Sequence, residues 1–345
     1  MSSLTHTAHY SRNIIKYGGV FVVGLVLLWT GTAAAIKAYQ LAHPPKIAPE
    51  AKYGLLKKII FPEKQYQKKV FSFEFSNDSP PVFEDKMKVY FIYRSNNVIL
   101  NLEKDRRVAQ AFGFVEKEKE ISPGIYEFSN STTNQVLTMN VLDSSFKLEY
   151  PYQSDQLLLS PESLPNKTSA IQIAKSYLST ADKLSTEIEQ GEQRVTYWKI
   201  SYDGLQAVNS QSDANAVRVD FSRKKLDEYE IIPSNLGSPP ISVLISGSSV
   251  NSKKVIGVNY KMVNIDRESY STYPIKTTRE AMADLEAGNY WPISDISGNN
   301  VSIKRVYLAY YEPFTLAQYL QPIFVFEGNN NFVGYVPAII DGWIE

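Results

Sequence analysis

The chain has 345 residues, with 36 lysines and arginines against 36 aspartates and glutamates. This neutral balance gives no global attraction for nucleic acid, and we expect no nucleic-acid partner. The chain has no cysteine, which excludes disulfides, thiolate metal sites and cysteine nucleophiles. Its histidines are His6, His9 and His43, so histidine-based catalysis is absent from the rest of the chain.

An apolar stretch near the N-terminus predicts a membrane anchor. After a short tail over residues 1–16, residues 17–37 read YGGVFVVGLVLLWTGTAAAIK. Twenty helical residues rise about 30 Å, the thickness of a bilayer's hydrocarbon core. We therefore expect a signal-anchored, single-pass protein of the cell membrane with its C-terminal part outside the cytoplasm. The alternative is a cleaved signal peptide, with small residues at positions 33–35 as the cleavage site.

A proline-containing linker is expected over residues 38–65, where Pro44, Pro45 and Pro49 favour an extended backbone. Within it, the stretch YGLLKKIIFPEK mixes apolar and basic residues. It is either an interfacial segment that lies on lipid headgroups or a strand or turn that begins the first domain. We favour the second interpretation, because the stretch is short and Pro62 ends it.

The remaining chain predicts an α+β architecture of about three modules, each with a helix laid on an antiparallel meander. We place the modules at residues 66–155, 160–248 and 249–345. Their helices are expected over residues 101–112, from about residue 168 to residue 191, and from Thr277 to Gly288. The last helix has the clearest boundaries, because Thr277 and Glu280 form a capping-box pattern and Gly288 suits a left-handed C-cap. The stretch YLQPIFVFEG, residues 319–328, is expected to be a central strand with Pro322 at its entry.

Four segments carry a family resemblance: NYKMVNIDRESYSTYPIKTTREAMADLEAGN, VSIKRVYLAYYEP, YLQPIFVFEG and FVGYVPAI. Together they resemble the C-terminal module of YycH/YycI-type proteins, and their layout is similar to that of PepSY-like modules. The resemblance covers roughly residues 255–340. It implies a membrane-anchored protein with external α+β domains that regulates an envelope-stress sensor kinase, and it carries over no catalytic residue. The general style also resembles uncharacterised membrane-anchored proteins of bacteria.

Catalytic and cofactor motifs are missing from the sequence. There is no nucleophile elbow, P-loop, zinc-binding HExxH, calcium loop or dinucleotide fingerprint, so we expect no enzyme activity, no cofactor and no metal. A pair of carboxylates is harder to exclude, since a glycosidase needs only two acids at the right separation. The candidates on or near predicted strands are Asp143, Glu149, Asp220 and Glu312.

Tyrosine is abundant, with 23 residues, and it gathers in the last meander. Tyrosine is enriched in protein-binding surfaces, but it also suits half-buried strands. We predict a protein-binding surface formed by Tyr307, Tyr310, Tyr311, Tyr319 and Tyr335. The leading functional hypothesis is a non-enzymatic protein that binds or regulates another envelope or membrane protein. The alternatives are a structural subunit of a cell-envelope or surface complex and a carboxylate-dependent cell-wall glycan hydrolase. The sequence leaves the oligomeric state open.

Overall fold

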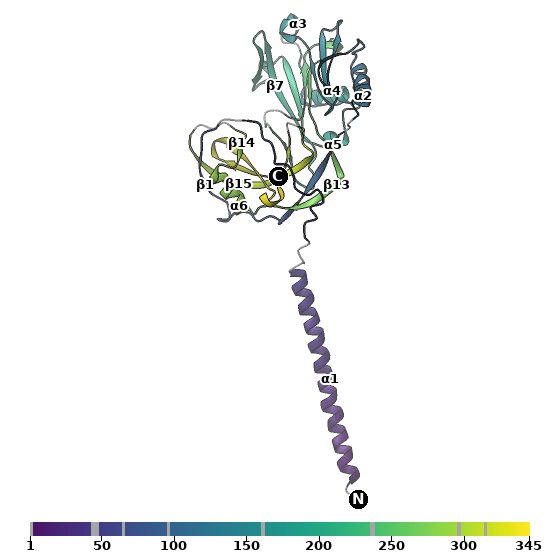
Figure 1. The fold of residues 1–345 in the computed structure, drawn as a ribbon, viewed down its shortest axis with the longest axis vertical. Coiled ribbons are helices and arrows are strands. Elements are labelled where there is room, and N and C mark those ends of the chain that lie inside the picture. Colours follow the sequence, from purple (N-terminus) through teal and green to yellow (C-terminus); the bar gives the residue numbers. More distant parts are fainter. Residues whose placement is uncertain are drawn as a thin grey trace. The chain divides into compact units, whose positions relative to one another are not determined.

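The computed structural model describes residues 3–42, 48–63, 66–94, 97–159, 163–234, 239–294, 298–313 and 316–345. Contacts divide the chain into two units, residues 1–48 and residues 49–345. The first unit consists of the 40-residue helix α1 (Ser3–Ala42). The second unit contains all the strands and the other helices (Figure 1).

The prediction of a transmembrane helix over residues 17–37 is wrong. These residues lie within α1, and no helix in the described part of the chain is long and apolar enough to cross a membrane. The valines and leucines of this stretch lie between residues 20 and 28, with Gly18 and Gly19 before them and Thr30, Gly31 and Thr32 after them. Such small or polar side chains contribute little to the transfer of a helix into hydrocarbon. The expectation of a signal-anchored, single-pass membrane protein rested on this helix and is corrected with it.

One sheet has eight strands, and its central path runs β1-β15-β16-β17-β14, with β10 paired to β15 and β2 paired to both β13 and β16. Pairing is antiparallel except that β1 and β10 both run parallel to β15. Its strands are β1 (Val70–Phe73), β2 (Lys86–Tyr93), β10 (Ile231–Pro233), β13 (Asn264–Pro274), β14 (Trp291–Pro292), β15 (Asn300–Glu312), β16 (Tyr319–Gly328) and β17 (Val333–Pro337).

The second sheet has nine antiparallel strands in the order β3-β4-β5-β6-β12-β11-β9-β7-β8. Its strands are β3 (Lys119–Ser122), β4 (Ile125–Asn130), β5 (Gln135–Asn140), β6 (Ser145–Glu149), β7 (Gln193–Ser201), β8 (Gly204–Val208), β9 (Ala216–Phe221), β11 (Ile241–Ser246) and β12 (Val255–Tyr260).

The prediction of about three helix-on-meander modules is also wrong, because strands distant in sequence share a sheet. β2 pairs with β13 and β16, although it lies in the expected first module and they lie in the third. Likewise β12, expected in the third module, joins β6 and β11 of the other sheet. Strand pairing depends on hydrogen bonds between any two compatible edges, so the order of strands along the chain does not determine their partners.

The predicted helices are present, with adjusted boundaries. The helix α6 (Thr278–Ala287) confirms the expected ends: Thr277 and Glu280 form a capping box, and Gly288 has a left-handed backbone with φ of 92°. The stretch from residue 168 to residue 191 forms two helices separated by a turn. The other helices of the second unit are α2 (Val98–Ala111), α3 (Gln156–Leu159), α4 (Lys167–Thr180) and α5 (Thr186–Glu189).

Each sheet packs one face against a helix. Ala281 and Leu285 of α6 are fully buried in the core that contains Phe324 and Phe326 of β16. In the nine-stranded sheet, the buried side of α4 packs with valines of β9 and β11. Figure 1 shows α6 beside β1 and β15, and α2 and α4 in the other group with β7. The strand YLQPIFVFEG is β16, paired on both sides as predicted.

Candidate functional site

The strands β15, β16 and β17 present alternate residues to two faces of the eight-stranded sheet, as the strand period of two requires. Tyr310 and Phe324 point into the core that contains α6. Tyr311, Ile323 and Tyr335 belong to a separate cluster on the other face. No helix in the described part of the chain contributes to that cluster, and we call this side of the sheet the helix-free face.

An extended segment, residues 56–62, covers part of the helix-free face, and we call it the covering segment. Its first residue, Leu56, is buried in the core that contains α6, and Ile59 and Phe61 pack against the cluster on the helix-free face. The side-chain Nε2 of Gln321 donates to the carbonyl of Lys57 at 2.8 Å, and the indole Nε1 of Trp291 donates to the carbonyl of Pro62 at 2.8 Å. These contacts hold the segment at both ends. Residues 56–62 of the predicted linker 38–65 are therefore packed on the sheet.

Aromatic rings fix the far end of the covering segment. The Phe61 ring stacks on Trp291 with a centroid distance of 5.5 Å, and it meets Tyr311 edge-on at 4.9 Å. Such pairs contribute roughly 0.5–1.5 kcal/mol beyond the burial of their area. The segment is thus a wall of the site with a fixed position on the sheet.

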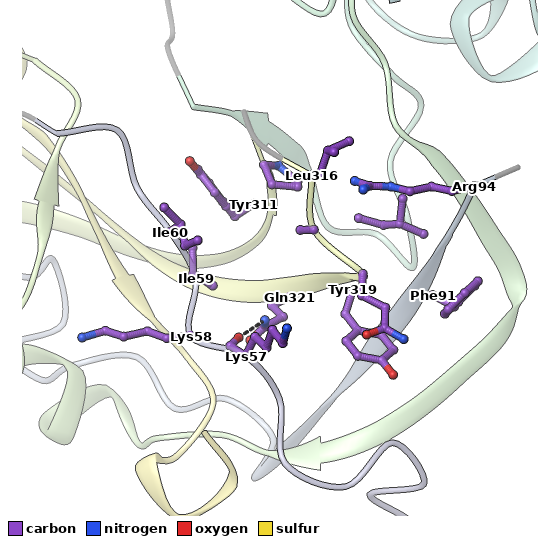
Figure 2. Close-up of a pocket in the computed structure, with 14 residues that line it drawn as sticks. Lys57, Lys58, Ile59, Ile60, Phe91, Arg94, Tyr311, Leu316, Tyr319 and Gln321 are labelled. Carbon is purple, nitrogen blue, oxygen red and sulfur yellow. Dashed lines mark hydrogen bonds between the residues drawn. The ribbon is translucent and has the colours of Figure 1, made fainter. Parts of the chain in front are cut away.

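A pocket of about 380 Å³ opens between the covering segment, the end of β2 and the start of β16 (Figure 2). Its volume lies near the lower end of the range of roughly 300–1,000 Å³ that is typical of ligand pockets, enough for one or two large side chains. The described residues that line it are Lys57, Lys58, Ile59, Ile60, Phe91, Ile92, Arg94, Tyr311, Pro313, Leu316, Ala317, Gln318, Tyr319 and Gln321.

The walls of this pocket are apolar, and two of the apolar side chains are largely exposed. Ile60 is 62% exposed and Leu316 is 56% exposed. The Tyr319 ring stacks on Tyr53 at 4.6 Å and meets Phe91 edge-on at 6.1 Å, so its position is held from two sides. Exposed apolar side chains gathered around a hollow are typical of a binding site.

The charged residues of the pocket all have the same sign. Its lining contains the cations Lys57, Lys58 and Arg94, and it contains no aspartate or glutamate among the described residues. Burial raises the pKa of the Tyr319 and Tyr311 phenols, which therefore stay neutral at ordinary pH. Burial lowers the pKa of the Arg94 guanidinium, but an arginine remains charged throughout the physiological range. The pocket is therefore positive.

The five tyrosines of the predicted binding surface lie in different places. Tyr310, Tyr311 and Tyr335 are at most 2% exposed, and their hydroxyls have no hydrogen-bond partner among the described residues. Tyr319 and Tyr307 are half-buried. Tyr311 and Tyr319 line the pocket, and Tyr307 lines a separate cleft of about 1040 Å³. The structure thus brings two of the five together at this pocket and places Tyr310 and Tyr335 in the core.

The four carboxylates considered for glycan hydrolysis are each engaged within the chain. Oδ1 of Asp220 lies 2.8 Å from Nε of Arg218. Glu149 pairs with the lysine two residues before it at 2.6 Å, and Asp143 accepts from the backbone N–H two residues after it at 2.9 Å. Glu312 is buried against Arg223, with 2.9 Å between the carboxylate and the guanidinium. These contacts are those of structural ion pairs and turns.

A metal site is equally unsupported: the described residues contain no group of three or more His, Asp or Glu side chains placed to hold an ion. The pocket has no nucleophile paired with a base in its lining. What the arrangement offers is an apolar hollow with a positive rim, which suits binding.

Sequence reasoning missed most residues of this pocket, although part of the signal was visible. The stretch YGLLKKIIFPEK stood out for its mixture of apolar and basic residues, and it contributes Lys57, Lys58 and Ile60. Nothing in the sequence indicated that Arg94 and Leu316, which are far from it along the chain, would lie beside it. Their proximity follows from the pairing of β2 with β16.

Comparison with known proteins assigns no family to this chain. No protein-family model matches it, and no curated protein matches it. Among solved structures, it is similar to an uncharacterized protein from Eubacterium rectale ATCC 33656, with 13% identity, a TM-score of 0.40, and coverage of 73% of this chain and 82% of that chain. It is also similar to the C-terminal domain of YpeB from Bacillus megaterium, with 10% identity, a TM-score of 0.29, and coverage of 71% of this chain and 94% of that chain.

These similarities are weak. They carry no argument for either part of the predicted resemblance, to PepSY-like modules or to YycH/YycI-type proteins, and that resemblance stays a prediction. TM-scores of this size assign neither a fold family nor a function to the chain.

Proposed function

We propose that this protein is a non-enzymatic binding module, and that a segment of another protein docks in the pocket on the helix-free face. One observation carries the proposal: exposed Ile60 and Leu316 surround an apolar hollow at the margin of the helix-free face. Its lining combines Ile59 and Tyr311 of the cluster on that face with Tyr319, which packs against the core that contains α6. Exposed apolar groups around a pocket lose contact with water when a partner side chain enters, which favours association.

The fixed walls also favour binding. Gln321 holds the covering segment by its hydrogen bond to Lys57, and the ring of Tyr319 is held by Tyr53 and Phe91. A site whose walls are already ordered loses less conformational entropy when the partner binds. The prediction that the partner is an envelope or membrane protein, and that the globular part lies outside the cytoplasm, remains a prediction.

Site-specific photo-crosslinking in cells tests the proposal. A photoreactive residue at position 316 is expected to give a defined, saturable adduct with one partner protein. The same residue in place of Val82 is the matched control, because Val82 is 95% exposed and lies next to Pro81, whose carbonyl contacts Thr278 of α6. It should not give this adduct.

A second variant links the adduct to the pocket. Ile60→Arg places a charge on the exposed apolar rim and should remove the adduct formed from position 316, while far-UV circular dichroism stays unchanged. An adduct that forms equally from position 82, or that persists in the Ile60→Arg protein, would refute docking at this site.

A further inference from the structure

The pocket on the helix-free face differs in charge from its neighbours. A second pocket shares Lys58, Ile59 and Gln321 with the first pocket. In that second pocket, Lys276 is neutralised by Asp284 at 2.8 Å and Asp341 at 2.9 Å. The charged residues that line the first pocket are all cations, although Lys58 also lines the second pocket and the charge of Asp143, outside the lining, acts on Arg94.

The large cleft beside Tyr307 contains charges of both signs. The described residues of its lining include five cations and four acids, and Arg218 and Asp220 among them form an ion pair at 2.8 Å. A lining whose described charged residues are all cations is therefore a local property of the first pocket, in a chain whose total charge is zero. Charge complementarity of this kind selects partners and orients them.

The cations are spread along the pocket. Figure 2 shows Lys58 at one end and Arg94 at the other, with Lys57, Gln321 and Tyr319 between them. A lipid headgroup concentrates its negative charge at one point, whereas an extended peptide with several carboxylates distributes it along its length. The distribution of cations matches the peptide.

The apolar walls specify a further feature of the ligand. Ile60, Phe91, Leu316 and Tyr319 surround a volume of about 380 Å³, which suits one large aromatic or aliphatic side chain. Buried aromatic anchors commonly supply much of the binding energy of a peptide, and the charges around them supply specificity.

We infer that the occupant of this pocket is an acidic segment of a partner protein, in which a large apolar residue enters the hollow and flanking aspartates or glutamates meet Lys57, Lys58 and Arg94. The inference rests on the proposed function and specifies the chemistry of the partner. It also predicts that binding weakens as ionic strength rises, because the rim charges are exposed to solvent.

Synthetic peptides test this chemistry with the full-length chain. The probe is a fluorescent peptide in which one phenylalanine is flanked on both sides by glutamates. Its counterparts carry glutamine or lysine in place of every glutamate. By fluorescence anisotropy, we expect the glutamate peptide to bind at least about tenfold more tightly than the glutamine peptide, and the lysine peptide to bind most weakly.

Variants of the chain test the named residues. The double variant Lys57→Glu and Lys58→Glu should lower the affinity for the glutamate peptide by about tenfold or more. Arg94→Gln should lower this affinity as well. The control is Lys117→Glu with Lys119→Glu, which makes the same change in net charge at exposed positions at the edge of the nine-stranded sheet. The affinity of this control for the glutamate peptide should stay within about twofold of that of the unaltered chain.

The outcomes separate this inference from the proposed function. Equal affinity for the glutamate and glutamine peptides, both lost in Ile60→Arg, would overturn the acidic preference and leave peptide docking intact. If none of the three peptides binds, the inference is overturned, whereas a specific adduct from position 316 would still support a protein partner. If oleate binds and the peptides do not, and Ile60→Arg abolishes oleate binding, both the inference and the proposed function are overturned, because the pocket would then be an acyl-chain site.

Discussion

Asp105 shows how strongly a single buried group responds to its surroundings. It lies on the buried face of α2 with 3% of its surface exposed, and its Oδ2 has no hydrogen-bond partner among the described residues. Burial raises the pKa of its carboxyl to about 6, with Asp143 adding to the rise and Lys183 and Lys104 opposing it. The folded protein therefore disfavours the ionised form of Asp105.

This environment predicts a pH-dependent cost in the free energy of unfolding. Well below pH 4 the carboxyl is protonated in both the folded and the unfolded chain, and there is no penalty. As pH rises from about 4 to about 6, the unfolded chain releases this proton while the folded chain retains it, so up to about 3 kcal/mol of stability is lost, and the loss is complete above about pH 6. Asp105→Asn removes the titrating group and should abolish this loss.

The measurement is urea unfolding at pH 4 and at pH 7, followed by tryptophan fluorescence. The stability of Asp105→Asn relative to the unaltered chain should increase between the two values, independently of any constant packing effect of the amide. Asp203→Asn, at an exposed position, is the control and should show no such increase. If the free energies of unfolding of Asp105→Asn and the unaltered chain differ by the same amount at pH 4 and at pH 7, the buried environment described for Asp105 is contradicted.

At the scale of single elements, α6 shows what local chemistry determines. The hydroxyl of Thr277 accepts from the backbone N–H of Glu280, and the Glu280 carboxylate accepts from the backbone N–H of Thr277 at 2.7 Å. These bonds satisfy N–H groups that a helix start leaves without partners. Because all of them form within four residues, the sequence pattern was sufficient to predict this boundary.

Thr277→Ala removes the cap and should lower the free energy of unfolding by about 0.5–2 kcal/mol. Thr277→Ser keeps a hydroxyl at the same position and should retain most of the stability. Urea midpoints of the three proteins give the comparison. If the serine variant loses as much stability as the alanine variant, the contribution comes from the threonine methyl group and not from the cap.

The helix α1 shows the limit of element-scale reasoning. The apolar stretch 17–37 suggested a helix that spans a membrane. The element that forms is longer, from residue 3 to residue 42, and no helix in the described part of the chain is long and apolar enough to cross a membrane. The helical conformation was predicted correctly, and the membrane span was not.

At the scale of the whole molecule, an ion-pair network joins segments from both sheets. The side chain of Arg223, which follows β9, is 1% exposed. It donates to Glu312 at the end of β15 at 2.9 Å, to Glu187 of α5 at 3.1 Å and to the carbonyl of Val263 at 2.7 Å. Every partner lies at least 36 residues away along the chain, so only the tertiary structure assembles the network.

Arg223→Ala should destabilise the protein by roughly 3–5 kcal/mol, because it leaves Glu312 buried without its cation and removes one of the two cations that pair with Glu187. The matched control is Arg267→Ala. Arg267 also pairs with Glu187, at 2.7 Å, but it is 39% exposed and should contribute no more than about 1 kcal/mol. Thermal and urea unfolding of both variants test the difference, and equal losses would show that the buried network does not join the two sheets as described.

The sequence by itself determined the features that depend on neighbouring residues. These are the ends of α6, the strand character of YLQPIFVFEG, and the absence of cysteine chemistry. Part of the candidate site was also visible, in the basic and apolar stretch around Lys57 and Lys58. Caps, turns and alternation act over a few residues, so their causes are present in the local pattern.

The tertiary structure alone decided how the strands divide between two sheets and which tyrosines are buried. It placed Tyr310 in the core against α6 and Tyr311 one residue later on the opposite face. It also brought Arg94 and Leu316 to the covering segment and so formed the pocket. The physical reason is that the pairing of strands and the burial of a sheet face depend cooperatively on residues far apart in the sequence. Many tertiary arrangements are compatible with the same local pattern.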